Sequence, residues 1–151
     1  KRNQDRLNNN KKISEKDTPQ PQKTILISPW LDVRLKNPKI EEVQKTDKEL
    51  NKETLLLAGI AYAGENGMDS YLVNPIDGDL SKLQNIVIMT GTNDILNPDV
   101  SVLVEKAKQV GVNIQVKEYK GAPHIWLINQ KGEKEVIEQG WKDLIGELQI
   151  P

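Results

Sequence analysis

Residues 85–94, NIVIMTGTND, constrain the fold of this chain more than any other stretch. Ile86–Met89 form a short apolar run rich in β-branched residues, which is typical of a strand buried on both faces of a parallel sheet. Thr90–Asn93 then break the strand, and Asp94 stands just beyond its carboxyl end. Because chemistry in open parallel sheets collects at the carboxyl ends of strands, Asp94 is a candidate functional residue.

Two further strands are predicted, one before and one after this stretch. The run TILIS stops at Pro29 and predicts a buried strand over Ile25–Ser28. Residues 112–116 alternate apolar with polar side chains, as a half-buried strand does, and we expect Tyr119 to end that strand. Between the first two strands, Leu35–Val43 is interrupted by turn-forming residues, which predicts a loop.

Three helices are predicted between and after the strands. The first follows an expected capping box at Thr46-x-x-Glu49 and ends near Gly64. Its expected buried stripe is Leu50, Leu57 and Ala61, with Leu56 and Ile60 beside it. The last helix carries Ile137, Trp141, Leu144 and Leu148 at helical spacing.

The clearest helix follows the central strand. Asn97 is predicted to cap it, Pro98 suits its first position, and Gly111 closes it. Its apolar side chains fall on one stripe, which comprises Val100, Leu103, Val104, Ala107 and Val110.

The predicted order of elements is strand, helix, strand, helix, strand, helix. Such alternation indicates an α/β fold, in which helices cover both faces of a parallel sheet. Three strands are few for this architecture, because a parallel sheet needs both faces covered and its edges managed. We therefore expect more strands, which either precede Lys1 in the complete protein or come from another chain.

Composition excludes several classes of function. The 21 Lys and Arg residues nearly balance 22 Asp and Glu, which leaves no electrostatic footprint for nucleic acid or an acidic membrane surface. Cysteine is absent and His124 is the only histidine, which excludes thiolate chemistry, Cys-based metal sites and multi-His metal sites. No apolar run approaches ~18 residues. We expect a cytoplasmic protein that binds neither nucleic acid nor membrane.

Asp94 and His124 each follow the carboxyl end of a predicted strand. One right-handed helical crossover joins these two strands, so they should be neighbours whose loops emerge side by side. A carboxylate beside an imidazole fixes the tautomer of the ring and stabilises the imidazolium. The alternative role for Asp94 is a turn residue or a helix cap after a strand. The alternative for His124 is a partly buried ring whose hydrogen bonds are satisfied within the fold.

The chain resembles the carboxyl-terminal half of the α/β-hydrolase esterases of the hormone-sensitive-lipase-like group, the acetyl-esterase type. The pieces that match are ILISPWLDV at 25–33, NPIDGDLSKLQNIVIMTGTNDIL at 74–96 and EKAKQVGVNIQVKEYKGAPHIW at 105–126, in that order and spacing. The resemblance covers roughly Pro19 to Trp141. It implies that Asp94 is the acid of a catalytic triad and that His124 is its general base. It also places Asp32 in a mainly structural turn.

The resemblance divides the chain into regions. Residues 1–24 are a polar segment, the remnant of a preceding helix or a linker, and residues 25–151 are the second half of the hydrolase domain. Residues 35–82 are a lid or insert over an acyl pocket. Trp30 and Trp126 are substrate-pocket candidates, although packing is the alternative role for each. The implied partner is a small acyl ester, no metal or organic cofactor is implied, and a homo-oligomer is left open.

The departure from the family lies in the nucleophile. Members of this family carry a serine in a G-x-S-x-G elbow and an upstream glycine-rich oxyanion loop. Neither pattern occurs in this sequence. There are three explanations for the missing nucleophile half. The chain is a fragment of a longer esterase, the other half is a separate polypeptide, or the protein has lost its catalysis. We favour the first, because Lys1 begins about where the helix after the elbow would end. The 151-residue chain alone is then expected to be inactive.

The functional prediction is therefore a carboxylic ester hydrolase that lacks its serine in this chain. The alternative is a non-catalytic interaction or ligand-binding module on the same fold. A phosphate-binding protein is disfavoured, because no glycine-rich loop opens a helix.

Overall fold

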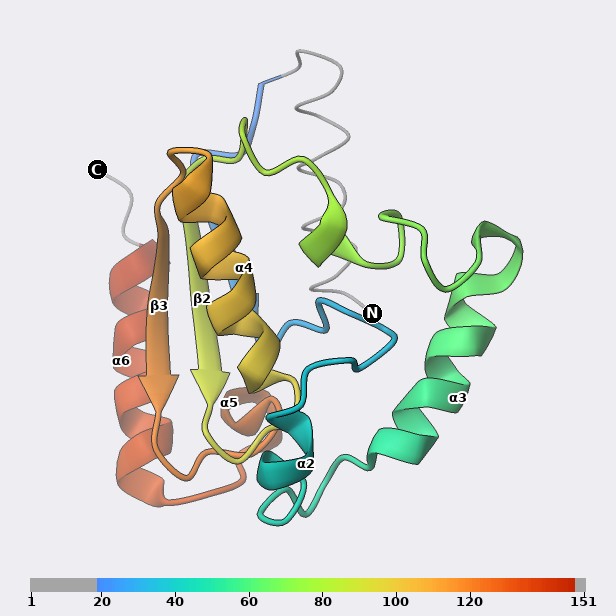
Figure 1. Cartoon of the computed structure of the whole chain (residues 1–151). Helices are drawn as coiled ribbons and strands as arrows, with labels where there is room; N and C mark the ends of the chain where they lie inside the picture. Colours follow the sequence, from blue (N-terminus) through green and yellow to red (C-terminus); the bar gives the residue numbers. More distant parts are fainter. Residues whose placement is uncertain (1–18, 149–151) are drawn as a thin grey trace.

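A computed structural model describes residues 19–148 of the chain (Figure 1). Residues 1–18, most of the predicted polar segment 1–24, lie outside this range. The strands β1 (Thr24–Ile27), β2 (Ile86–Gly91) and β3 (Ile114–Tyr119) form one sheet in the order β1-β2-β3. Both pairings are parallel, which confirms the predicted sheet and places the carboxyl ends of β2 and β3 side by side.

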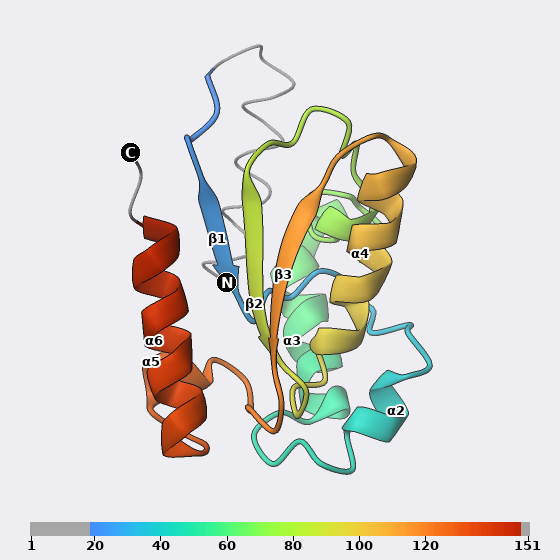
Figure 2. The ribbon, with the colours of Figure 1, turned by 90° about the vertical axis from the view of Figure 1, so that its left-hand side faces the viewer.

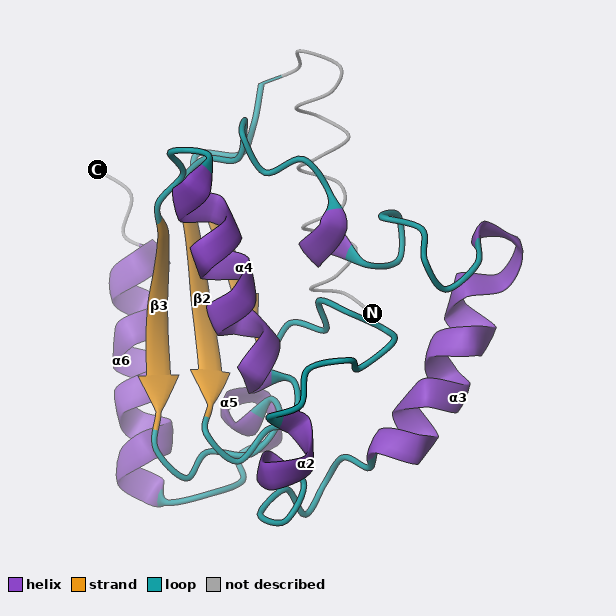
Figure 3. Ribbon diagram, in the orientation of Figure 1, coloured by secondary structure: helices purple, strands orange, loops and turns teal. Residues whose placement is uncertain are grey.

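Helices cover both faces of this sheet, as expected. Figure 2 shows α4 (Asn97–Gln109) on one face and α6 (Lys134–Leu148) on the other, with α5 (Trp126–Asn129) beside α6. Two shorter stretches of 3₁₀ helix, at Gly64–Asn66 and Pro75–Asp77, lie in the connection between β1 and β2. The same connection holds α2 (Ile40–Val43) and α3 (Lys52–Ala63), and Figure 3 shows it as mostly loop.

The core is divided by the sheet into two layers. Successive residues of a strand point to opposite faces, so Ile88 of β2 packs with Leu103 of α4 while Met89 packs with Trp126 of α5. All six residues of β2 are buried, as its continuous apolar run predicted. The strand extends two residues past the predicted Met89, to Gly91, before the chain turns.

The helix α4 agrees with its predicted stripe, but its start differs from the prediction. Val100, Leu103 and Ala107 are buried, whereas Val110 lies beyond the helix and is exposed. Asn97 is the first helical residue and not the cap, and no side chain caps this end. The Asn97 side chain instead contacts Thr90 and Glu118, two residues at the ends of neighbouring strands.

The predicted capping box at Thr46 and Glu49 is wrong. Asp47 Oδ1 accepts the amides of Glu49 and Leu50 and makes a local turn, so the helix begins six residues after Thr46, at Lys52. Asn51 caps α3 by accepting the Thr54 amide, and Gly64 ends it as expected. The loop predicted at 35–43 contains the short helix α2.

The predicted buried stripe of α3 is only partly confirmed, because the helix stands apart from the sheet (Figure 1). Leu50 and Leu56 are partly buried against the apolar cluster that includes Leu35 and Ile40. Leu57 is 70% exposed and Ile60 is 58% exposed, whereas Gly59 and Ala63 are buried. Gly59 is needed there because a Cβ would lie 2.8 Å from the carbonyl oxygen of Val33.

The last strand and the last helix lie close to their predicted positions. β3 begins two residues later than the predicted Val112 and ends at Tyr119 as expected. On α6, Ile137 and Leu144 pack against the layer around Trp126, whereas Trp141 and Leu148 of the predicted stripe are exposed.

Candidate active site

Asp94 and His124 meet at the carboxyl ends of β2 and β3. The Asp94 Oδ2 atom lies 2.9 Å from His124 Nδ1. Asp94 is completely buried, while the His124 side chain keeps 21% of its surface exposed. The predicted proximity of the two side chains is confirmed, and their catalytic roles stay a prediction.

Backbone hydrogen bonds join the two loops that carry this pair. The Thr92 amide donates to the Tyr119 carbonyl at 3.0 Å, and the Asn93 amide donates to the Ala122 carbonyl at 3.1 Å. In return, the Gly121 amide donates to Thr92 Oγ1 at 2.8 Å. The loops therefore hold each other in place without any contribution from the Asp94 and His124 side chains.

Gly91 allows this close approach. A Cβ at this position would lie 2.1 Å from the carbonyl oxygen of Ala122, a separation that no side chain can have without moving the backbone. The last residue of β2 must therefore be glycine for the His124 loop to lie where it does.

Both oxygens of the Asp94 carboxylate have partners. Oδ1 accepts the Leu96 amide at 2.9 Å, and Oδ2 faces His124. An ionised carboxylate can only accept hydrogen bonds, so opposite an ionised Asp94 a neutral His124 ring would carry its proton on Nδ1 and leave Nε2 as its acceptor nitrogen. This arrangement suits a general base whose tautomer is set by an acid.

The residue after His124 has a strained backbone. Ile125 has a φ of 44°, in the left-handed region that β-branched residues rarely adopt. Its amide donates to Ser28 Oγ at 3.0 Å, across 97 positions of sequence. Backbone strain of this kind costs about 1–3 kcal/mol and is often found at functional sites.

The two tryptophans proposed for the pocket lie in different surroundings. Trp126 is fully buried and packs on Tyr119, with ring centroids 4.7 Å apart, so in this structure it packs in the core. Trp30 is half-buried; its indole N–H donates to the Asp32 carbonyl at 2.9 Å, and its ring packs among apolar residues of the insert.

Asp32 has the structural role expected for it. Its Oδ1 accepts the Arg34 amide at 2.9 Å and the Arg34 Nε–H at 2.7 Å. Arg34 also pairs with Asp69 and Asp77, so one guanidinium joins three carboxylates from separate loops. The hydrogen bonding of the Arg34 guanidinium to the Asp32 carboxylate, which accepts, is the main cause that raises the pKa of Arg34.

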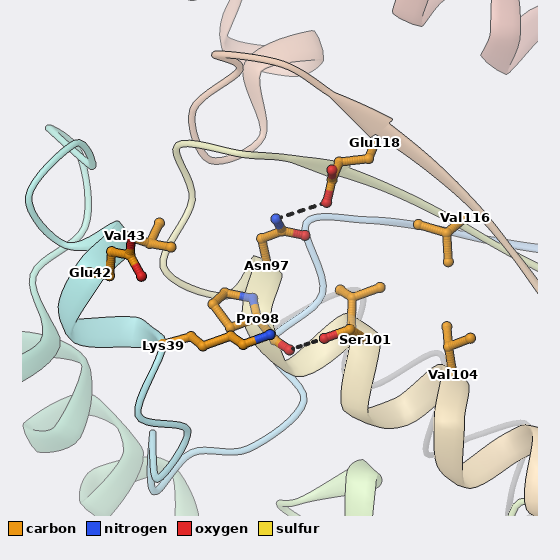
Figure 4. Close-up of a pocket in the computed structure, with 10 residues that line it drawn as sticks. Lys39, Glu42, Val43, Asn97, Pro98, Ser101, Val104, Val116 and Glu118 are labelled. Atoms are coloured by element: carbon orange, nitrogen blue, oxygen red, sulfur yellow. Dashed lines mark hydrogen bonds between the residues drawn. The ribbon is translucent and has the colours of Figure 1, made fainter.

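A surface pocket of about 500 Å³ lies between the α2 region, the first turns of α4 and β3 (Figure 4). It is lined by Lys39 and Glu42 of the α2 region, by Asn97 and Ser101 of α4, and by Glu118 of β3. Neither Asp94 nor His124 lines it. We therefore assign the candidate active site from the hydrogen-bonded pair and not from this pocket.

The contacts of Ser28 and Asp47 with this site were not foreseen from the sequence. Each accepts a backbone amide next to one member of the pair, Ile125 for Ser28 and Ile95 for Asp47. These contacts span 97 and 48 positions, and local patterning carries no signal at such a distance.

The parallel sheet, its helical layers and an acid–imidazole pair on adjacent strand ends are consistent with the α/β hydrolase fold. Comparison with known families agrees, since the alpha/beta hydrolase fold family matches residues 9–128. The chain belongs to that family. No helix among residues 19–148 is long and apolar enough to cross a membrane.

Two curated relatives share part of this sequence. The chain is 26% identical to an acetyl-hydrolase of Streptomyces hygroscopicus over 116 residues, which is 76% of this chain and 38% of the relative. It is 33% identical to an esterase of Acinetobacter venetianus over 103 residues, which is 67% of this chain and 34% of the relative. The chain thus spans little more than a third of the length of either relative.

Solved structures show the same fold. An esterase of the bacterial hormone-sensitive lipase family has a TM-score of 0.82 at 20% identity, covering 93% of this chain and 46% of that structure. A hormone-sensitive lipase from a metagenome library has a TM-score of 0.79 at 24% identity, covering 91% and 49%. This chain therefore matches about half of each of these folds.

Proposed function

We propose that this chain is the acid–base half of a serine carboxylesterase. Its nucleophile and oxyanion hole would come from polypeptide outside these 151 residues. The observation that carries the proposal is the 2.9 Å contact between the buried Asp94 carboxylate and His124 Nδ1. Supporting it, the family match covers residues 9–128, and two curated relatives are an acetyl-hydrolase and an esterase.

The proposed reaction uses His124 twice. A serine hydroxyl supplied from outside the chain attacks the ester carbonyl and gives its proton to His124 Nε2. The imidazolium, held and stabilised by Asp94, returns that proton to the oxygen of the leaving alcohol. Water then repeats the sequence on the acyl-enzyme and releases the acid. Backbone amides outside this chain stabilise the oxyanion at each step.

The segment 35–82 is proposed as a lid or insert over the acyl pocket. Its helix α3 stands apart from the sheet, and Leu57 and Ile60 present apolar surface on it. Trp30 is the pocket candidate that this arrangement favours, because it is half-buried against insert residues while Trp126 is enclosed. Small or medium acyl esters are the proposed substrates, an inference that comes from the family alone.

Hydrolysis of an aryl acetate tests the proposal. The coding sequence upstream of Lys1 is first read for a G-x-S-x-G pattern. The 151-residue chain and the longer product are then assayed side by side. We expect an inert chain and an active longer product. An inactive longer product across a series of short-chain esters would favour the non-catalytic binding module instead.

A further inference from the structure

The residues that follow Asp94 and His124 are held in the same way. The Ile95 amide donates to Asp47 Oδ2 at 2.9 Å, and the Ile125 amide donates to Ser28 Oγ at 3.0 Å. Both acceptors are buried, with Asp47 at 7% and Ser28 at 4% exposure. Each member of the pair is thus followed by an amide that a distant side chain holds.

The contact from Ser28 restrains the His124 loop. Ser28 ends the β1 segment, and its own amide donates to the Met89 carbonyl at 2.9 Å, which fixes it against β2. Its hydroxyl then holds the Ile125 amide, although Ile125 has the unfavourable φ of 44°. Without this hydrogen bond the partly buried Ile125 amide would lose its acceptor, and the strained backbone could relax and carry His124 with it.

The contact from Asp47 restrains the Asp94 turn. Oδ1 of Asp47 accepts the Glu49 amide at 2.8 Å and the Leu50 amide at 2.9 Å, so the carboxylate is already fixed within its own turn. Oδ2 is then aimed at Ile95. Apolar packing reinforces this polar contact, because Ile95 and Leu96 are buried among insert residues that include Leu35 and Ile40.

The amides of Ile95 and Leu96 divide between two carboxylates. Ile95 donates to Asp47, whereas Leu96 donates to Asp94 itself. The first bond anchors the turn to the insert, and the second fixes the Asp94 carboxylate within that turn. A displacement of this turn would therefore also displace Asp94 Oδ2, the atom that faces His124.

We propose that Ser28 and Asp47 are positioning residues, which fix the His124 loop and the Asp94 turn so that the two side chains meet. The expected effect of these residues on catalysis rests on the proposed function. Their expected effect on the positions of the Asp94 and His124 side chains does not. It also gives the insert a second role, because the segment that would cover the acyl pocket holds the triad acid through Asp47.

The first test reads the ring of His124 and needs no activity. Nitrogen-15 NMR of labelled histidine in the longer product, assigned by the signal missing from His124→Ala, reports which ring nitrogen carries the proton. In the parent protein we expect the Nδ1–H tautomer. In Asp47→Asn an NH₂ group faces at least one backbone N–H, and in Ser28→Ala the acceptor is gone. Both variants should show a mixture of tautomers.

Two control variants each lose one side-chain hydrogen bond outside the insert and away from the two loops. Ser101→Ala removes the hydroxyl that donates to the Pro98 carbonyl at 2.8 Å, and Gln115→Ala removes the side-chain amide that donates to Glu147 Oε1 at 3.2 Å. These variants should keep the parent tautomer. A purely structural role would let all four variants lose stability while His124 stays unchanged, and that result would overturn the proposal.

The second test reads catalysis in the same proteins. We expect Asp47→Asn and Ser28→Ala to lower kcat on the order of 10-fold with KM nearly constant, because misplacement of reacting groups affects the chemical step. The controls should keep the parent kcat. If the parent hydrolyses no ester, the proposed function fails, and the NMR result alone then decides whether Ser28 and Asp47 position the pair.

Discussion

The Asp94 carboxylate and the His124 ring lie 30 positions apart in the chain and 2.9 Å apart in space. Asp94→Asn keeps the size of the side chain but can place an NH₂ group against Nδ1, which favours the wrong tautomer of the ring. We expect kcat of the longer product on an aryl acetate to fall about 10⁴-fold, with KM little changed.

The experiment has a direct internal control. Asp69→Asn alters a carboxyl whose side chain is 84% exposed and that belongs to the Arg34 network, so kcat should stay near that of the parent. An Asp94→Asn variant with parental kcat would remove Asp94 from the reaction.

Asp99 makes folding stability depend on pH. Burial raises its pKa from 3.8 to about 6, the Asn37 hydrogen bond opposes this rise, and Asp32 adds to it. One of its oxygens, Oδ2, is buried without a hydrogen-bond partner. Because the folded state holds the proton more tightly than the unfolded state, this group destabilises the fold as pH rises from about 4 to about 6.

The size of the effect follows from the shift of about two pKa units, which corresponds to about 3 kcal/mol. Urea unfolding at several pH values should show that Asp99→Asn flattens the stability–pH profile over this range. Asn37→Ala removes the bond that lowers the Asp99 pKa, so the loss of stability with rising pH should extend to higher pH. Parallel profiles for the parent and Asp99→Asn would contradict this account.

Two glycines of α6 should respond oppositely to alanine. A Cβ at Gly146 meets nothing within 4 Å, so Gly146→Ala should stabilise the protein by about 1 kcal/mol through helix propensity. A Cβ at Gly140 would lie 3.0 Å from Leu127 and 3.2 Å from Trp126, both fully buried. We expect thermal unfolding to show no gain for Gly140→Ala. Equal stabilisation by both substitutions would contradict this expectation, because it would show that Leu127 and Trp126 shift to accommodate the new Cβ at little cost.

Gly91→Ala should disturb the site through the backbone. The new Cβ collides with the Ala122 carbonyl, and the loop that carries His124 must move. We expect a stability loss of about 2–4 kcal/mol and a fall in kcat on the order of 100-fold in the longer product. Gly111→Ala changes a glycine with φ of 76° and open space outside the insert, so it separates backbone strain from collision and should leave kcat unchanged. A Gly91→Ala variant with normal kcat would show that the loop can shift harmlessly.

The strands and the acid–base pair could be predicted because their signals are local. The run at 86–89 has the composition of a doubly buried strand, and strand adjacency follows from the handedness of a single helical crossover. Asp94 and His124 each follow one of these adjacent strands, so the sequence alone is enough to place their loops side by side.

The insert could not be predicted in the same way. The sequence around Thr46 fits a capping box, but Asp47 forms the turn instead, since its carboxylate satisfies three backbone amides and one of them is Ile95, far along the chain. Likewise, Leu57 and Ile60 have the spacing of core residues in an amphipathic helix. They are exposed because α3 stands apart from the sheet. Tertiary contacts overrode local preference at both places.

A double-mutant cycle on kcat tests most directly whether Asp94 and His124 act as one unit. Asp94→Asn, His124→Ala and the double variant are made in the longer product and assayed on one aryl acetate. If Asp94 acts only through the imidazole, the double variant should hydrolyse the ester within about 3-fold of the rate of His124→Ala alone. If the two losses multiply instead, the carboxylate and the ring work independently, and the acid–base assignment is contradicted.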